Sequence, residues 1–325
     1  MQIMLSCASH APLYYFPARD TEPLRALRGA IAGMKAQIMA FDPQLVVLFG
    51  SDHYGGQQMN SMPAFCIGVE AKALDDVGGT PGTLKVPKEI AVGAIRHLRE
   101  DGVDVAVSYA MEVDHGFSQI LREFTGGVDT FPVLPIYVSC LQPPLVPFHR
   151  GRALGQAVGS YLAGLNYDRI LVLATGGLSH EPTFLFPPID EVSDEWKPYI
   201  LHGRDQNKVS QQAWIDYEIA AHKQGATFLA NTDIPLPALG IHEDFDRKFV
   251  DLICRGELSA VDGWQADTVM KEGGFGAMEI LTWIAATQAM QTLTGVRPQP
   301  VFQHGIKEIG VGVGIVKADP AARLE

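Results

Sequence analysis

The sequence has few of the features that would mark a secreted, membrane-embedded or nucleic-acid-binding protein. No window approaches the roughly 18 uninterrupted apolar residues of a membrane span, and MQIMLSCASH has no basic start of the secretory type. Only four cysteines occur in 325 residues, with no CxxC pair: Cys7, Cys66, Cys140 and Cys254. Scattered cysteines in a chain this long indicate reduced thiols, so we expect a soluble cytoplasmic protein.

Positive charge is also scarce. The chain has 25 Lys and Arg against 37 Asp and Glu, a net charge of −12, and its basic residues form no cluster. This balance argues against nucleic acid as a partner, and nothing in the sequence indicates a membrane partner. Apolar residues make up 47% of the chain and charged residues 19%, so a sizeable core is expected rather than disorder.

The order of the predicted elements favours an α/β fold. Strands are expected at 1–10, 45–50, 103–109, 131–139, 169–177 and EIGVGVGIV, and helices from about residue 21 and at 88–100, 151–165, DFDRKFVDLIC and 277–293. Their alternation predicts a single domain over 1–325 with a central, mostly buried sheet flanked by helices. Residues 185–260 are expected to form a cap or to line a pocket.

Four histidines share one setting. His10, His53, His115 and His180 each follow a predicted strand or its exit loop. In open α/β sheets ligands bind at the carboxyl ends of the strands, so four imidazoles there would meet in one crevice. A single buried histidine is more often a core residue, but four in equivalent positions weaken that alternative. No role is expected for the histidines at 97, 149, 202, 222 and 304.

Imidazole is both a metal ligand and an acid–base group near neutral pH. Histidines alone suit zinc, whereas two histidines with one carboxylate leave open positions that suit Fe(II) and oxygen. Asp52 and Asp114 each precede one of the histidines, and neighbours on an extended chain point in opposite directions. These two carboxylates are therefore expected to orient loops or to support a ligand. Gly55 and Gly56 are expected to leave room beside His53.

Two further carboxylates are candidates. Glu279 in KEGGFGAMEILTW interrupts an apolar run at a predicted helix start. It is either a functional carboxylate or simply a glutamate favoured by the helix dipole, and the fragment alone leaves both open. In GIHEDFDRKF, His242 and Asp246 lie four residues apart, but their charged surroundings favour a solvated helix start. The chain has no nucleophile elbow, no GxGxxG motif and no P-loop.

Taken together, the motifs SHAPL, DHY, VDHGF, GGLSH and GAMEILTWIAA resemble those of class III extradiol catechol dioxygenases, the LigB-like superfamily. Their order in the chain is most similar to the 2,3-dihydroxyphenylpropionate 1,2-dioxygenase branch. The resemblance covers most of the chain and is weakest across 185–240. It implies an enzyme that opens the ring of a catechol with O2, and a homo-oligomer.

The resemblance also implies roles for particular residues. His10, His53 and Glu279 would bind Fe(II) as the cofactor. His115 and His180 would be the acid–base pair. Asp114 would hold the loop of its neighbour, and Pro182 would shape the loop that follows GGLSH.

Two other readings of the same residues stay open. The histidine cluster could serve a Zn-dependent hydrolase, or the chain could be a non-catalytic binding protein on this scaffold. The precise catechol also stays open. A carboxylate on its side chain would need a cationic or hydrogen-bonding partner, and the sequence alone places no Arg or Lys in the pocket.

Overall fold

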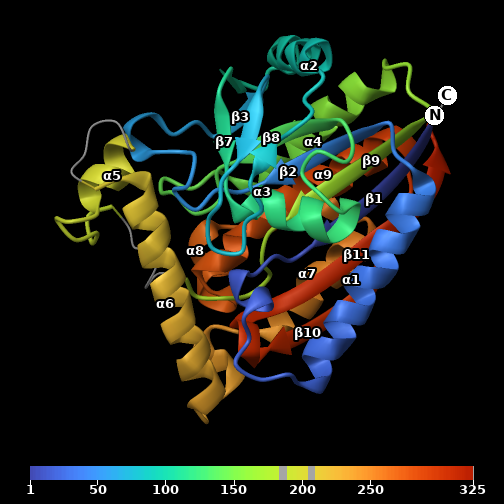
Figure 1. Cartoon of the computed structure of the whole chain (residues 1–325). Coiled ribbons are helices and arrows are strands. Elements are labelled where there is room, and N and C mark those ends of the chain that lie inside the picture. Colours follow the sequence, from blue (N-terminus) through green and yellow to red (C-terminus); the bar gives the residue numbers. More distant parts are fainter. Residues whose placement is uncertain (183–188, 204–208, 325) are drawn as a thin grey trace.

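Eight strands form one mixed sheet at the centre of the computed structural model, which describes residues 1–182, 189–203 and 209–324 (Figure 1). The strand order is β10-β11-β1-β9-β2-β8-β3-β6. In chain order these strands are β1 (Gln2–Ala8), β2 (Leu45–Gly50), β3 (Phe65–Gly68), β6 (Ala106–Ser108), β8 (Val133–Val138), β9 (Arg169–Thr175), β10 (Gln299–Ile306) and β11 (Val311–Ala322). A second, small sheet holds β5 (Gly82–Thr83), β4 (Ala71–Ala73) and β7 (Met111–Val113).

The middle of the large sheet is parallel. Strands β1, β9, β2 and β8 run in the same direction, whereas β11 pairs antiparallel with β1 and brings the two termini together (Figure 1). Every residue of β2 and β8 is buried. Strands covered on both faces need continuous apolar runs, which explains the composition of LVVLFG and VLPIYV.

Helices cover both faces of this sheet. Alternate residues of one strand enter different cores: Val47 packs in the cluster that includes α4 and α9, and Val46 in the cluster that includes α1 and α3. The helices with residues in the first cluster are α2 (Lys88–Glu100), α4 (Phe148–Ala163), α7 (Glu243–Arg255), α8 (Ala266–Gly273) and α9 (Ile280–Thr294), and the main helices of the second are α1 (Glu22–Phe41) and α3 (His115–Ile120). The expected α/β class, with a buried sheet between helices, is confirmed.

The contact between α4 and α9 depends on glycine. A Cβ atom at Gly155 of α4 would lie 2.1 Å from the main-chain oxygen of Ala285. We expect Gly155→Ala to lower the free energy of unfolding by about 1–3 kcal/mol, because the two backbones must separate. Gly29→Ala is the matched control, since a Cβ atom there meets nothing within 4 Å and alanine favours a helix by up to about 1 kcal/mol. Urea unfolding of both variants measures the difference, and equal stability would contradict this packing.

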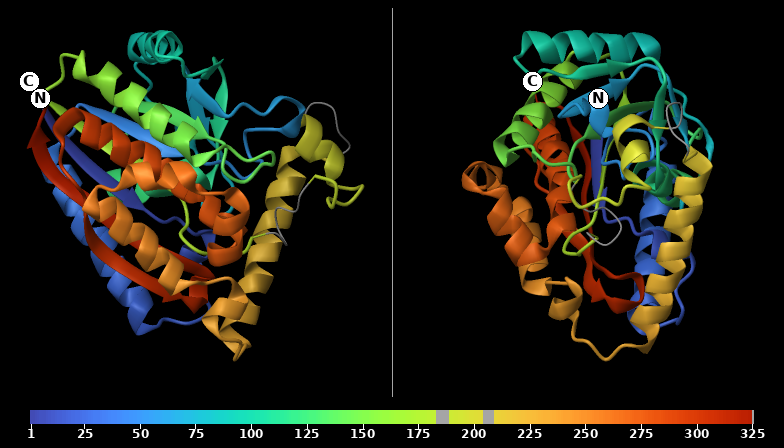
Figure 2. Two further views of the ribbon diagram at one scale, coloured as in Figure 1. Left: turned by 180° about the vertical axis from the view of Figure 1, so that it is seen from behind. Right: turned by 90° about the vertical axis from the view of Figure 1, so that its left-hand side faces the viewer.

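A separate cluster attaches α5 (Lys197–His202) and α6 (Gln211–Asn231) to the rest of the molecule. Trp214 of α6 stacks on Tyr199 of α5 with ring centroids 5.2 Å apart, and Tyr54 completes the group. The Tyr199 hydroxyl donates to the main-chain oxygen of Tyr54 (3.1 Å). Figures 1 and 2 show α6 as a long helix at one side of the molecule. None of the described helices is long and apolar enough to cross a membrane.

Several element boundaries differ from the sequence prediction. The expected strand at 103–109 shortens to the three residues of β6, and the expected helix at 277–293 begins at Ile280, after a 3-10 turn over Phe275–Glu279. The 21-residue helix α6 was not predicted, because prolines and charges dominate the sequence around it. Part of the expected cap segment, residues 185–188 and 204–208, lies outside the described residues.

Candidate active site

Three of the four histidines come from neighbouring strand ends. His10 follows β1, His53 follows β2 and His180 follows β9, and β9 lies between the other two in the sheet. His115 arrives differently: it follows β7 of the small sheet and opens α3. The expectation that all four share one sheet edge is therefore wrong for His115, because its strand belongs to another sheet.

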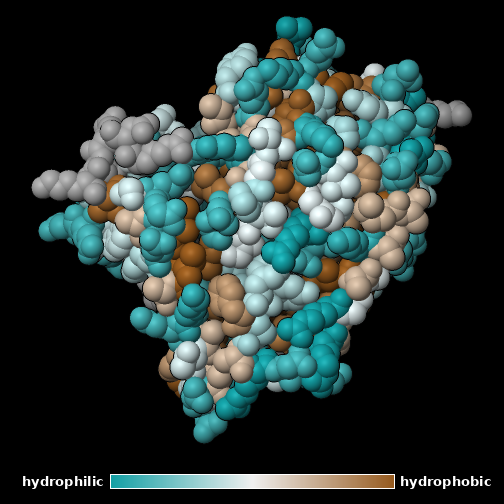
Figure 3. Space-filling view, viewed as in Figure 1, coloured by the Kyte–Doolittle hydropathy of each residue, from teal (hydrophilic) through white to brown (hydrophobic). Residues whose placement is uncertain are grey.

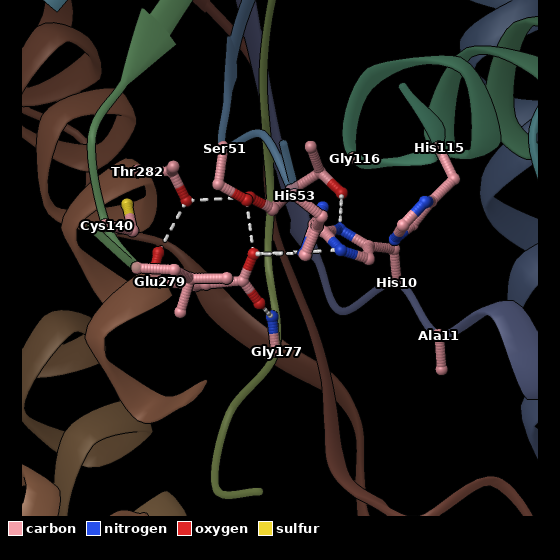
Figure 4. Close-up of polar contacts among 12 residues, drawn as sticks. His10, Ala11, Ser51, His53, His115, Gly116, Cys140, Gly177, Glu279 and Thr282 are labelled. Atoms are coloured by element: carbon pink, nitrogen blue, oxygen red, sulfur yellow. Dashed lines mark hydrogen bonds and ion pairs between the residues drawn. The ribbon is translucent and has the colours of Figure 1, made fainter. Parts of the chain in front are cut away.

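The rings nevertheless converge. His53 stacks on His115 with ring centroids 4.2 Å apart, and the ring of His10 lies 5.2 Å from that of His53 and 5.4 Å from that of His115. All three side chains are buried. Figure 4 shows these three imidazoles grouped together, with Glu279 reaching toward them from the side of α9.

Glu279 is the carboxylate that faces this group. Its side chain is 1% exposed, so it is not merely a solvated glutamate at a helix start. Oε1 lies 3.7 Å from Nε2 of His10 and 3.5 Å from Nε2 of His53, and Oε2 lies 3.9 Å from Nε2 of His180. The main-chain N–H of Gly177 donates to Oε2 (2.6 Å) and the Ser51 hydroxyl donates to Oε1. The carboxylate is thus held in place from β2 and β9.

The imidazole nitrogens of His10 and His53 that point away from Glu279 are also held by polar contacts. Nδ1 of His10 hydrogen-bonds with Oγ1 of Thr175 (2.9 Å), and Nδ1 of His53 lies 3.3 Å from Oδ2 of Asp114. The same oxygen of Asp114 accepts the main-chain N–H of His53, and Oδ1 accepts the N–H of Gly116 (2.8 Å). Asp114 therefore caps its own helix and also orients His53, and Nε2 of both histidines is left facing Glu279.

Asp76 belongs to this site although the sequence did not indicate it. Its Oδ2 lies 2.6 Å from Nδ1 of His115 and accepts the main-chain N–H of the same residue (2.9 Å). Asp76 thus engages Nδ1 of His115, and Nε2 is the ring nitrogen that it leaves available. The only sequence signal is the turn segment DDVGGT. A Cβ atom at Gly79 of that segment would lie 1.8 Å from Oδ1 of Asp76.

The site joins a group of imidazoles to an anionic carboxylate. Burial lowers the pKa of His10 and of His115 to about 3. Burial alone would raise the pKa of Glu279, but the imidazoles of His10, His53 and His180 outweigh it and hold that pKa well below its usual range. For His53, the carboxylates of Asp114 and Glu279 outweigh burial and raise the pKa. A buried carboxylate of this kind needs a cation beside it.

The donor set fits a metal ion. Ligand atoms that share an ion about 2.0–2.2 Å away cannot be more than about 4.4 Å apart, and both distances from Glu279 Oε1 to imidazole Nε2 atoms satisfy this limit. Two imidazoles and one carboxylate are the donors of non-haem Fe(II) sites. His10, His53 and His115 also form a group whose ligand atoms lie within 4.8 Å of one another. The three imidazoles are thus a second group of candidate ligands beside the carboxylate.

The structure bears out one expectation about the GSDHYGG loop and contradicts another. The carboxylate of Asp52 orients its own loop, because it accepts the main-chain N–H groups of Gly56 (2.9 Å) and Gln57 (3.0 Å) and so closes the turn. Gly55 and Gly56 do not make room for a ligand. A Cβ atom would lie 2.7 Å from Cβ of Asp114 at Gly55, and 1.9 Å from the main-chain oxygen of Glu112 at Gly56. These glycines allow the loop to pack against the segment that carries His115.

The expectation of a solvated helix start at His242 and Asp246 is also wrong. Asp246 is 1% exposed, and its carboxylate accepts the main-chain N–H and the hydroxyl of Ser179, both at 2.8 Å. The contact fixes the GGLSH loop, which carries His180. The sequence did not indicate this contact, because charged residues on the other side of the helix surround Asp246 along the chain.

A cavity of about 580 Å³ opens onto the histidines. His10, His53, His115 and His180 line its inner part. Residues from 222 to 242 form one wall, including His222 and Phe228 of α6, and Met270 and Lys271 of α8 belong to another. Figure 3 shows hydrophobic side chains beside α6 within a largely hydrophilic face. His222, for which the sequence indicated no role, and His242 thus add two further imidazoles to this cavity.

Comparison with known proteins agrees with this geometry. Residues 4–314 match the family model described as the catalytic LigB subunit of aromatic ring-opening dioxygenase. The chain belongs to the LigB family. The resemblance found in the motifs is thereby confirmed, and with it the assignment of the chain to the extradiol dioxygenase class of enzymes.

Named relatives of this LigB-family chain share nearly its whole length. A 2,3-dihydroxyphenylpropionate/2,3-dihydroxicinnamic acid 1,2-dioxygenase of Mycolicibacterium paratuberculosis is 40% identical over 98% of this chain and 100% of its own. One of the same name from Azotobacter vinelandii is 35% identical over 98% of this chain and 99% of its own. Among solved structures, an uncharacterized protein of Escherichia coli K12 covers 97% of this chain and 98% of its own at 12% identity, with a TM-score of 0.48.

Proposed function

We propose that this LigB-family enzyme uses Fe(II) and O2 to open the ring of a catechol that resembles 2,3-dihydroxyphenylpropionate. The observation that carries the proposal is the position of Glu279, a buried carboxylate within 3.7 Å of two imidazole Nε2 atoms whose rings are held from behind. The printed names of the relatives supply the substrate class. His10, His53 and Glu279 would hold the metal, which when bound supplies the centre where catechol and O2 react.

The other residues of the site would handle protons. His115 and His180 line the cavity beside the metal ligands, and each has Nδ1 engaged, by Asp76 in one and by the main-chain oxygen of Leu178 (3.0 Å) in the other. Nε2 of each ring is then the atom that can exchange a proton with the substrate. In this proposal one imidazole takes a phenolic proton and the other returns a proton to the group that leaves.

The acid–base roles are tested by His115→Gln and His180→Gln, each assayed after anaerobic loading with Fe(II). We expect each variant to bind iron and to lose about 10²–10⁴-fold in kcat, the usual contribution of a positioned proton-transfer group. Oxygen uptake and ring-product absorbance measure the loss. Near-full ring cleavage by both variants would disprove the assignment.

Asp76→Asn tests the support of His115. The amide cannot reproduce the carboxyl group that contacts both the main chain and Nδ1 of His115, so we expect kcat to fall about 10–100-fold while the iron content stays at the wild-type level. The matched control is Asp75→Asn, which changes the neighbouring residue in the same turn. Loss of iron in Asp76→Asn would instead indicate that His115 is itself a ligand.

A zinc hydrolase is the second candidate, because the imidazoles of His10, His53 and His115 have ligand atoms within 4.8 Å of one another and histidine is a common zinc ligand. Metal analysis together with oxygen uptake distinguishes the two functions. The non-catalytic alternative would require that no catechol is consumed with any metal.

The proposal extends to the organisation of the protein. We place the activity in one catalytic domain over 1–325, with the wall formed by residues 222–242 supporting a pocket-lining role for 185–260. We also propose that the protein is a cytoplasmic homo-oligomer and that neither nucleic acid nor a membrane is its partner, as its charge and the family resemblance indicated.

A further inference from the structure

We propose that Lys271 recognises the carboxylate of the substrate side chain and so selects anionic catechols over neutral ones. This inference rests on the proposed function, since it concerns the substrate of the same site. Lys271 lies in the last turn of α8 and lines the same cavity as His10, His53, His115 and His180.

The charge of the cavity lining singles out this residue. Among the described residues that line the cavity, Lys271 is the one with a lysine or arginine side chain. No ion pair joins it to an acid within the described ranges, whereas Lys248 on the neighbouring α7 binds Glu272 (2.8 Å). In a chain of net charge −12, an anion gains most from a cation that is not already neutralised.

The imidazole of His222, which also lines the cavity, does not supply this charge. Nδ1 of His222 bonds to the main-chain oxygen of Glu218 (2.7 Å), so Nδ1 is the protonated nitrogen. Burial lowers the pKa of His222 to about 4, which leaves the ring neutral at pH 7 with a lone pair on Nε2. A carboxylate accepts hydrogen bonds and would find no donor there.

The walls between the histidines and Lys271 suit a hydrocarbon linker. Met270, Leu239 and Phe228 line the same cavity and offer apolar surface. Among the described lining residues the one acidic side chain is that of Glu181, and one of its carboxylate oxygens accepts the main-chain N–H of Phe275 (3.1 Å). A catechol bound at the histidines would thus extend a short apolar chain along these residues, with its carboxylate toward the lysine.

The test compares Lys271→Gln with Lys248→Gln, a charge removal outside this cavity, and with Lys271→Arg, which keeps the charge. With 2,3-dihydroxyphenylpropionate we expect Lys271→Gln to raise KM about five- to twentyfold at nearly unchanged kcat, the size of one charge-assisted hydrogen bond at a partly exposed site. The methyl ester of the same substrate should show no such change, and Lys271→Arg should restore most of the affinity.

A binding measurement separates this inference from the proposed function. Isothermal titration of metal-free protein with 3-phenylpropionate, which lacks the diol, should give a Kd that rises about five- to twentyfold in Lys271→Gln only. Lys271 is not the carboxylate partner if Lys271→Gln changes the KM of the acid and of its methyl ester alike. The same conclusion follows if 3-phenylpropionate binds equally well to Lys271→Gln and to the wild type, or if it binds to neither protein. If binding depends on Lys271 but no variant opens a catechol with Fe(II), the carboxylate site stands and the proposed function fails.

Discussion

The Glu279→Ala variant should lose its metal, and its ring-opening activity should fall more than about a thousandfold. The variant removes the single carboxylate from the group that we assign to the metal and leaves two imidazoles, which bind a divalent ion weakly by themselves. It also leaves the hydroxyl of Ser51 and the main-chain N–H of Gly177 without their acceptor. Anaerobic reconstitution, iron analysis and oxygen uptake measure the effect.

The control for this variant is Glu218→Gln, another buried glutamate. Glu218 is 2% exposed on α6, and burial raises its pKa, so exchange for a neutral amide should change little. We expect this variant to keep stoichiometric iron. Stoichiometric iron in Glu279→Ala would show that the metal is held by other residues, with the three-imidazole group as the first alternative.

Asp114→Ala should weaken both the metal site and the fold, because one carboxylate serves two purposes. Its loss removes the N-cap of α3, worth about 1 kcal/mol of stability, and releases Nδ1 and the main-chain N–H of His53. We expect metal affinity to fall about 10–100-fold, as for other residues that orient a metal ligand. Competition with a chelator measures the affinity, and thermal unfolding of the metal-free protein measures the cap.

Asp52→Ala separates these contributions. Asp52 closes the turn after His53 without contacting the ring, so its loss should affect stability and leave the metal affinity of the folded protein near the wild-type value. An equal loss of affinity in both variants would mean that the loop as a whole, rather than the contact of Asp114 with His53, determines binding.

The strand ends could be predicted because their signal is local. A short apolar run marks a buried strand, and a histidine within a few residues of its end lies at the sheet edge, which holds for His10, His53 and His180. The position of His115 was predicted wrongly because the sequence does not show that β7 belongs to a second sheet. Glu279 stood out only as a charge within an apolar run; its partners became clear once α9 was placed against β1 and β2.

The residues that the sequence could not indicate act over long separations. Asp76 contacts His115 across 39 positions, and Asp246 contacts Ser179 across 67. Neither has a periodic or apolar neighbourhood that distinguishes it from a surface acid. His222 and Lys271 likewise meet at one cavity only because α6 and α8 both face it, and no pattern along the chain records that arrangement.

The most direct test of the account is oxygen consumption by anaerobically prepared protein that is reconstituted with one equivalent of Fe(II) or of Zn(II). With 2,3-dihydroxyphenylpropionate, the Fe(II) protein should consume one O2 for each substrate and form a yellow ring-opened product, and the Zn(II) protein should consume none. Fe(II) protein that binds the catechol but takes up no O2 would contradict the account.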